Sequence, residues 1–353
     1  MNLTQMRRWM EEEKFYFWIV IVVVLFNTTF AILGSISAPR PKKEALLAEK
    51  EDFVMDREKM AATFRQKPWL RIVLGAGTLV VFILFFLGLV FAGQFLVQRA
   101  KGELVVPWRP PDEAALWTLR DVFHIVVLLV FSSYLVELFG FLFFHTLRLE
   151  ASESLRILST TFLTDLIVLY LILRLVKREK KQTLSHLGLS KNAFTRNLLF
   201  GLRGYLSLLP ALLVTLFVSL WLANLFHLSP PDQPLYDLFA QGSSGGLFLL
   251  GLVLVVFLGP VIEEVFFRGF LYNALKMKWG KKWAILSSGM LFAGLHANWV
   301  GFLPITLLGC ALAYGYELTG SLVASITIHV VHNFLVMAIF LFTNHFSQLF
   351  GIF

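Results

Sequence analysis

The chain contains nine apolar stretches, most of them long enough to cross the roughly 30 Å hydrocarbon core of a lipid bilayer. No stretch shows the period-2 alternation of a membrane barrel, so the backbone polar groups must be satisfied within helices. We therefore predict an all-α, polytopic transmembrane helix bundle of about eight to nine helices, the seventh of them short. The predicted helices are Phe15–Leu33, Ile72–Leu96, Val122–Leu147, Leu158–Val176, Leu198–Phe226, Leu247–Leu275, Trp283–His296, Val300–Leu318 and Leu322–Phe342.

Composition agrees with a membrane protein and narrows the remaining classes. Of the 353 residues, 57% are hydrophobic and 15% are charged, a balance that water-soluble domains do not show. Basic loops against anionic lipid account for the net charge of +8, so we expect the lipid bilayer as a partner and no nucleic acid. The single cysteine, Cys310, excludes a disulfide within the chain and a cysteine-based metal cluster, and its apolar surroundings favour a packing role.

Basic residues in short loops set the expected orientation. The strongest cluster is Lys177–Gln182 and the second is Lys276–Lys282, and both should be cytoplasmic. The connection His227–Gly246 contains no Lys or Arg and fits the outer side. Counting back from these loops places the N-terminus inside and the loop 37–68 outside. We expect an integral, multi-pass protein of the cell (inner) membrane.

Ionisable residues at membrane depth are the main functional signal, because each costs free energy unless it is paired or faces a cavity. Glu263 lies 13 residues before Lys276, about 20 Å from the cytoplasmic surface in an α-helix. His296 lies 14 residues beyond Lys282, at a similar depth. His329 lies about 12 to 15 Å in from the turn before its helix. Three groups from three helices thus fall within about two helical turns in depth, which indicates a shared site.

Helical spacing separates the two adjacent glutamates. Glu264 and Arg268 stand four residues apart on one helix face and can form an ion pair. Glu263 is turned about 100° away and remains free for another role. Pro260 removes a backbone donor just before the carboxylates, and a kink there would let water reach them.

The same i, i+4 spacing recurs at both histidines. The ring of Phe292 can pack beneath His296 and fix its orientation. His329 and Asn333 place an imidazole and a carboxamide on one helix face. A carboxamide can donate a hydrogen bond to a developing negative charge.

These three motifs, in this order on successive helices, resemble the signature of the CPBP intramembrane proteases, also called Abi or CAAX proteases, which include the type II CAAX prenyl endopeptidase. The resemblance covers about residues 158–342. The motifs are EExxxR (Glu263, Glu264, Arg268), FxxxH (Phe292, His296) and HxxxN (His329, Asn333).

The resemblance implies an intramembrane endopeptidase in which a carboxylate and a histidine hold and activate a water, while a second histidine and an amide stabilise the oxyanion. It divides the chain into an N-terminal transmembrane region (1–150) with the first three helices, a protease core (151–345) and a C-terminal tail (346–353). By the resemblance, the catalytic residues are Glu263, His296, His329 and Asn333, and the supporting residues are Glu264, Arg268 and Phe292.

Two mechanisms remain open at this point. Glu263 and His296 can hold the water without a metal. Alternatively, Glu263, His296 and His329 can bind a divalent zinc that keeps a position open for water. The sequence contains no HExxH motif, and the spacing does not choose between them.

A different class of function also remains open: a non-enzymatic polytopic membrane protein, such as a transporter or a regulatory scaffold. No internal repeat of the kind found in transporters is present, which favours the protease. We interpret Glu137 and Asp165 as buried structural residues and His332 as a partner of a backbone carbonyl. For the protease, we expect the substrate to be a membrane-associated peptide or protein.

Overall fold

The structure is a computed structural model that describes residues 14–24, 63–103, 106, 115–146, 153–228, 239 and 245–350. Regular secondary structure in these ranges is helical, as predicted. The α-helices used below are α4 (Trp69–Lys101), α5 (Leu119–Thr146), α6 (Glu153–Arg174), α7 (Phe194–Leu225), α9 (Gly245–Val253), α10 (Gly259–Glu264), α11 (Asn273–Leu295), α12 (Phe302–Thr319) and α13 (Leu322–Phe350). The short π- and 3-10 helices are η1 (Leu175–Glu179), η2 (Leu184–Leu187), η3 (Leu254–Leu258) and η4 (Val265–Tyr272).

Seven helices within the described ranges are long and apolar enough to cross a membrane, close to the predicted eight to nine. The run Gly245–Leu295 counts once, although it contains two of the predicted helices. Gly280, with φ of 74° and ψ of 171°, interrupts the helical backbone between them. Residues 25–62, which hold the end of the first predicted helix and most of the loop 37–68, lie outside the described residues.

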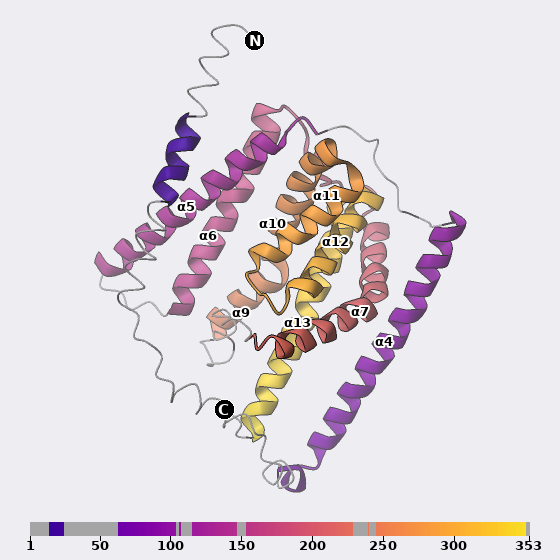
Figure 1. Ribbon diagram of the computed structural model, residues 1–353. Coiled ribbons are helices and arrows are strands. Elements are labelled where there is room, and N and C mark those ends of the chain that lie inside the picture. Colours follow the sequence, from indigo (N-terminus) through magenta and orange to yellow (C-terminus); the bar gives the residue numbers. More distant parts are fainter. Residues whose placement is uncertain are drawn as a thin grey trace.

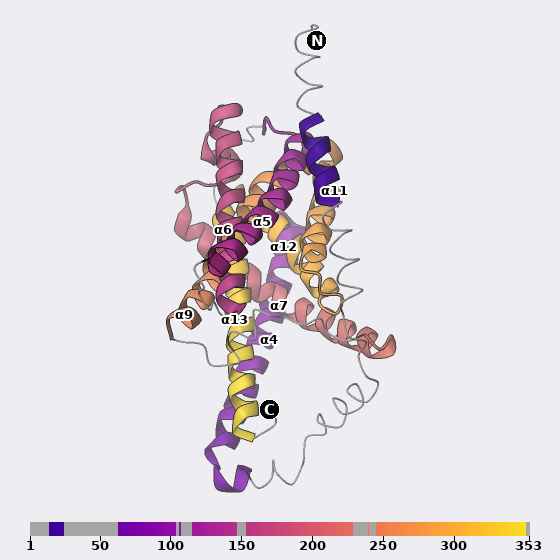
Figure 2. The same cartoon turned by 90° about the vertical axis from the view of Figure 1, so that its left-hand side faces the viewer.

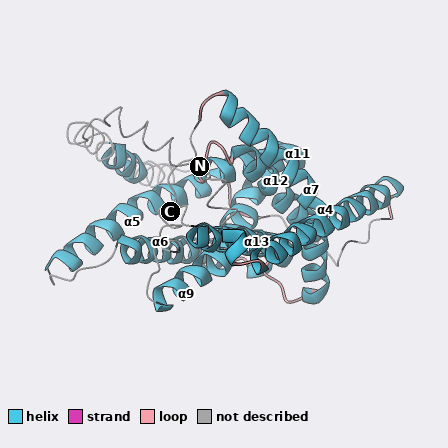
Figure 3. Cartoon of the chain, turned by 90° about the horizontal axis from the view of Figure 1, so that it is seen from below, coloured by secondary structure: helices cyan, strands magenta, loops and turns pink. Residues whose placement is uncertain are grey.

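The helices of the C-terminal half form the centre of the bundle (Figure 1). There α11 packs against α12, and both α12 and α13 pack against α7. On one side α5 packs against α6, and on the other side α4 packs along α7 (Figures 1 and 2). Seen from below, α4 and α5 extend toward opposite ends of the molecule (Figure 3). The last helix, α13, continues past residue 345 to Phe350.

The core surrounds η4. All eight residues of this π-helix are buried, because α6, α11, α12 and α13 all pack against it or its neighbours. A helix enclosed on all sides has no solvated face on which to place a charge. Arg268, the one charged residue of η4, therefore has to find its partners inside the bundle.

A pair of glycines lets α11 and α12 cross closely beside this core. A Cβ atom on Gly289 would lie 2.6 Å from Sγ of Cys310, and one on Gly309 would lie 2.8 Å from Cα of Gly289. Larger residues would push the helices apart. The half-buried Cys310 packs at this crossing, as its predicted role requires.

Candidate active site

Two π-helices frame the short helix that carries the glutamates. η3 ends at Leu258, α10 follows with Pro260 in its first turn, and η4 begins directly after Glu264. Proline supplies no backbone N–H, so the regular i to i−4 pattern cannot pass through this position. Widened π-turns of this kind occur frequently at functional sites. The structure thus has a π-helix on each side of α10, the helix in which a kink at Pro260 is predicted.

Glu264 and Arg268 form the ion pair that their spacing predicts. The Arg268 Nη1 atom lies 2.6 Å from Glu264 Oε1, and both side chains are fully buried. Arg268 Nη2 donates to the carbonyl of Gly309 at 3.1 Å, and the guanidinium lies 4.5 Å from the centroid of the Phe292 ring. These further contacts stabilise the buried guanidinium. Arg268 Nε and Glu264 Oε2 are buried and have no hydrogen-bond partner among the described residues.

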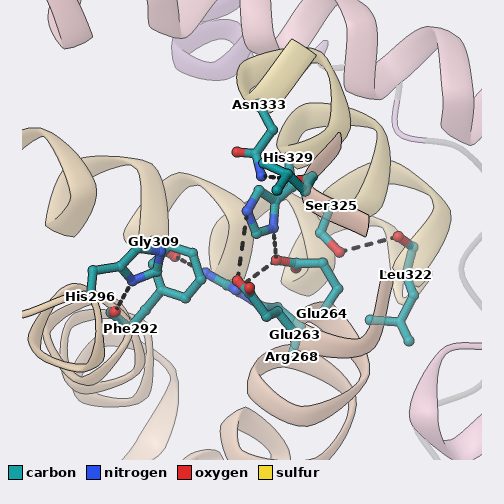
Figure 4. A network of polar contacts seen from close by, with 11 residues as sticks. Glu263, Glu264, Arg268, Phe292, His296, Gly309, Leu322, Ser325, His329 and Asn333 are labelled. Carbon is teal, nitrogen blue, oxygen red and sulfur yellow. Dashed lines mark hydrogen bonds and ion pairs between the residues drawn. The ribbon is translucent and has the colours of Figure 1, made fainter. Parts of the chain in front are cut away.

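His329 joins the two glutamates across the bundle (Figure 4). Its Nδ1 atom donates to Glu264 Oε1 at 2.9 Å, since an ionised carboxylate can only accept. Its Nε2 atom lies 3.8 Å from Glu263 Oε2, too far for a direct hydrogen bond. The imidazole is 2% exposed, whereas the Glu263 side chain is 37% exposed. Glu264 thus orients a buried histidine toward the more open glutamate.

The hydrogen bond between Glu264 and His329 is a feature that the sequence did not reveal. The spacing along one helix accounts for the contact of Glu264 with Arg268, but His329 comes from α13, which approaches α10 only in the folded bundle. The only signal in the sequence was the similar depth estimated for His329 and for Glu263, the neighbour of Glu264. Glu264 therefore accepts from a guanidinium and an imidazole at one oxygen, Oε1.

His296 directly follows the last residue of α11 and is exposed. Its Nδ1 atom donates to the carbonyl of Phe292 at 2.7 Å, which fixes the ring. The Phe292 ring is fully buried and lies between the two histidines, 4.6 Å from the His296 ring and 5.4 Å from the His329 ring between centroids (Figure 4). The predicted packing of Phe292 against His296 is present, and the same ring also packs against His329.

Asn333 contacts the backbone of η3. Its Nδ2 atom donates to the carbonyl of Val255 at 2.9 Å. This hydrogen bond occupies one of the two hydrogens of the amide and ties α13 to the π-helix that precedes the glutamates. The side chain predicted to stabilise the oxyanion therefore has a structural contact as well.

The three side chains considered as zinc ligands do not form a common ligand set. Among the residues that the structure describes, no group of three or more His, Cys, Asp and Glu side chains is arranged to hold a metal ion. His329 directs Nε2 toward Glu263, while His296 lies across the Phe292 ring and is fixed by a backbone carbonyl. This donor arrangement does not fit a zinc site.

Three other polar residues differ from their sequence interpretation. Glu137 is exposed on α5 rather than buried. Asp165 of α6 is half-buried and lies within electrostatic range of Glu263 of α10. His332 has its Nδ1 atom 3.3 Å from the hydroxyl of Tyr205 in α7, a side-chain partner in place of the expected backbone carbonyl. Sequence spacing could not identify the neighbours of Asp165 and His332, because in each case the two residues lie on different helices.

Comparison of the sequence with known protein families identifies the family that this site resembles. Residues 245–335 match the family model described as type II CAAX prenyl endopeptidase Rce1-like. The predicted family resemblance is confirmed. This Rce1-like segment (245–335) begins with α9, ends within α13 and contains all three motifs, although it is shorter than the span 158–342 inferred from the sequence. No curated protein and no solved structure matches the chain at a significant level.

The Rce1-like segment and the apolar helices together describe an integral, multi-pass membrane protein. The family indicates protease activity of the CAAX-endopeptidase type and a peptide or protein as substrate. All of the polar contacts between Glu264, Arg268, Gly309 and His329 fall within the segment.

Proposed function

We propose that the protein is an intramembrane endopeptidase that hydrolyses a peptide bond in a membrane-associated peptide or protein, in the cell (inner) membrane. The observation that carries the proposal is the position of His329, held by buried Glu264 with its second ring nitrogen 3.8 Å from the more open Glu263. A histidine fixed by one carboxylate beside a second, free carboxylate is suited to acid–base chemistry.

Glu263 acts as the general base in this mechanism. Its Oε2 atom, which has no hydrogen-bond partner among the described residues, takes a proton from a water held with His296. The water oxygen bonds to the scissile carbonyl carbon, and the carbonyl oxygen becomes negative. The C–N bond then breaks, and Glu263 passes its proton to the leaving amine nitrogen. Water and peptide are consumed, and a carboxylic acid and an amine are formed.

The charges around His329 support its role as an oxyanion donor. Glu263, Glu264 and Arg268 together carry one net negative charge in their ionised forms, which an imidazolium at His329 would balance. With Nδ1 donating to Glu264, a proton on Nε2 would be available to the developing oxyanion. The remaining hydrogen of the Asn333 amide would supply a second donor.

The experiment compares two membrane carboxylates in purified protein. Cleavage of quenched fluorescent peptides is measured with farnesylated and unmodified CAAX tails of identical sequence. We expect Glu263→Gln to abolish cleavage, while Glu137→Gln, which changes an exposed carboxylate on α5, leaves it intact. Cleavage by Glu263→Gln at the wild-type rate would refute the assignment. Absence of cleavage of every peptide by wild-type protein would favour the non-enzymatic membrane protein.

A further inference from the structure

A short segment outside the Rce1-like segment contacts the catalytic region directly. Residues 115–118 precede α5, and Trp117 among them is fully buried against η4. We infer that Trp117 is a positioning residue for the active site: it fixes the end of η4 and thereby the geometry of Arg268, Glu264 and His329. The inference rests on the proposed function, and part of its test does not depend on activity.

The contact between Trp117 and η4 is specific in direction and in shape. The indole Nε1 atom donates to the carbonyl of Phe270 at 2.8 Å, and the Trp117 and Phe270 rings stack with centroids 5.6 Å apart at an angle of 28°. Both side chains are fully buried. A buried hydrogen bond with a stacked ring fixes both the height and the rotation of the residue it holds.

The bond lies at the junction where η4 becomes α11. There the backbone N–H of Asn273 donates a hydrogen bond to the Phe270 carbonyl, and the Asn273 side chain donates to the carbonyl of Gly269 at 2.7 Å. Side chains thus satisfy carbonyls where the hydrogen-bond register changes from π to α. Trp117 is the donor at this junction that comes from 153 residues away in the sequence.

Trp117 is itself held on both sides. The backbone N–H of Leu116 donates to Gln182 Oε1 at 3.0 Å. Thr118 donates its backbone N–H to Asp121 Oδ2 at 2.7 Å, the reciprocal half of a capping box at the start of α5. Asp121 in turn pairs with Lys180 at 2.9 Å. The segment is therefore attached to the first predicted cytoplasmic cluster and cannot shift independently of it.

The loop that follows this cluster contacts both helices of the site. A Cβ atom on Gly269 would lie 2.9 Å from the carbonyl oxygen of Leu187, so this loop packs directly on the η4 backbone. The carbonyl of Gly188 accepts from the N–H of Leu322, the first residue of α13, at 2.9 Å. The contacts of Leu187 and Gly188 thus hold the helix of Arg268 and the helix of His329 in fixed relation.

The path from Trp117 to the site is short. Arg268 lies two residues before Phe270 in the same π-helix, and its guanidinium binds Glu264 at 2.6 Å. Glu264 then binds His329 at 2.9 Å through the same oxygen. A small displacement of η4 would change where Arg268 meets this oxygen and so change the orientation of the imidazole.

The test uses the full-length protein and the change Trp117→Phe, which removes the indole N–H but keeps an aromatic ring. The matched control is Trp221→Phe, at a residue that is 64% exposed on α7. With the farnesylated peptide, we expect Trp117→Phe to lower kcat about tenfold and to change KM less than about twofold. The free energy of one buried hydrogen bond corresponds to about a tenfold change in rate. The control should match wild type in both constants.

A spectroscopic readout tests the same inference without a substrate. In protein labelled with ¹⁵N-histidine, the His329 ring signals are assigned by their loss in His329→Gln. Trp117→Phe should shift these signals, and Trp221→Phe should not. Unchanged His329 signals together with unchanged kcat would overturn the inference. If wild-type protein cleaves no peptide, the proposed function fails, and the His329 signals alone decide the inference.

Folding is monitored in parallel by gel filtration in detergent. If Trp117→Phe does not yield folded protein, Gln182→Ala is measured in the same way, since it removes the acceptor of the Leu116 N–H from the same segment. A folded Gln182→Ala protein with a shifted His329 signal would support the positioning role. Failure of both variants to fold would contradict it, because the segment would then serve the stability of the whole bundle.

Discussion

Arg268→Met removes the cation of the buried network while keeping an unbranched side chain of similar reach. Glu264, which is fully buried, keeps its contact with His329 but loses its cationic partner at 2.6 Å, and the Gly309 carbonyl loses its donor at 3.1 Å. Removing one member of a buried ion pair costs about 3–5 kcal/mol, because the other charge remains uncompensated. Typical domains are stable by only about 5–15 kcal/mol. We therefore expect a severe loss of stability.

Thermal unfolding in detergent, at one scan rate for all variants, measures this loss. For a protein of 353 residues we expect the Tm of Arg268→Met to fall by roughly 4–7 °C. The matched control is Arg203→Met, which changes an exposed arginine on α7 and should leave the Tm close to wild type.

The double variant Glu264→Gln/Arg268→Met separates charge from packing. It removes both charges, so its cost should be at least about 2 kcal/mol smaller than the sum of the two single changes. Activity should remain low in the double variant, because His329 no longer faces an ionised Glu264. A Tm of Arg268→Met within about 1 °C of wild type would refute the reasoning. So would a stability loss of the double variant equal to the sum of the losses of the two single variants.

Three further outcomes are expected. His296→Ala should abolish cleavage while costing about 1 kcal/mol or less in stability, since the exposed ring makes one bond to the Phe292 carbonyl; a large fall in Tm would show a structural role instead. Asn333→Asp should lose about 1–3 kcal/mol and most activity, because a carboxylate would face the Val255 carbonyl; full activity would contradict the amide's role as a donor. Cleavage should survive treatment with a strong chelator, measured with and without added zinc, since the histidines and Glu263 do not form a ligand set; loss restored by zinc would disprove the metal-free mechanism.

Local spacing predicted the parts of the site that lie on one helix. The Glu264–Arg268 pair and the packing of Phe292 against His296 follow directly from residues four positions apart. The apolar stretches likewise predicted the helices, because a bilayer allows few other structures for such runs.

Contacts between helices could not be predicted in this way. The bond from His329 to Glu264 and that from Asn333 to Val255 depend on how α13 lies against α10 and η3. Depth in the membrane indicated which residues share a level, but it did not indicate which atoms meet. The π-helices also escaped prediction, since one residue added to a turn leaves an all-apolar sequence pattern unchanged.

The break in α11 at Gly280 separates the candidate catalytic residues into two groups along the chain. The two carboxylates and the guanidinium precede Gly280: Glu263, Glu264 and Arg268. The two imidazoles and the carboxamide follow it: His296, His329 and Asn333. Because membrane helices can insert separately and then associate, two polypeptides separated at this loop would each be inert, and hydrolysis would require their reassembly. The basic segment between Lys276 and Lys282 is thus the natural place at which to make the proposed activity dependent on an added polypeptide.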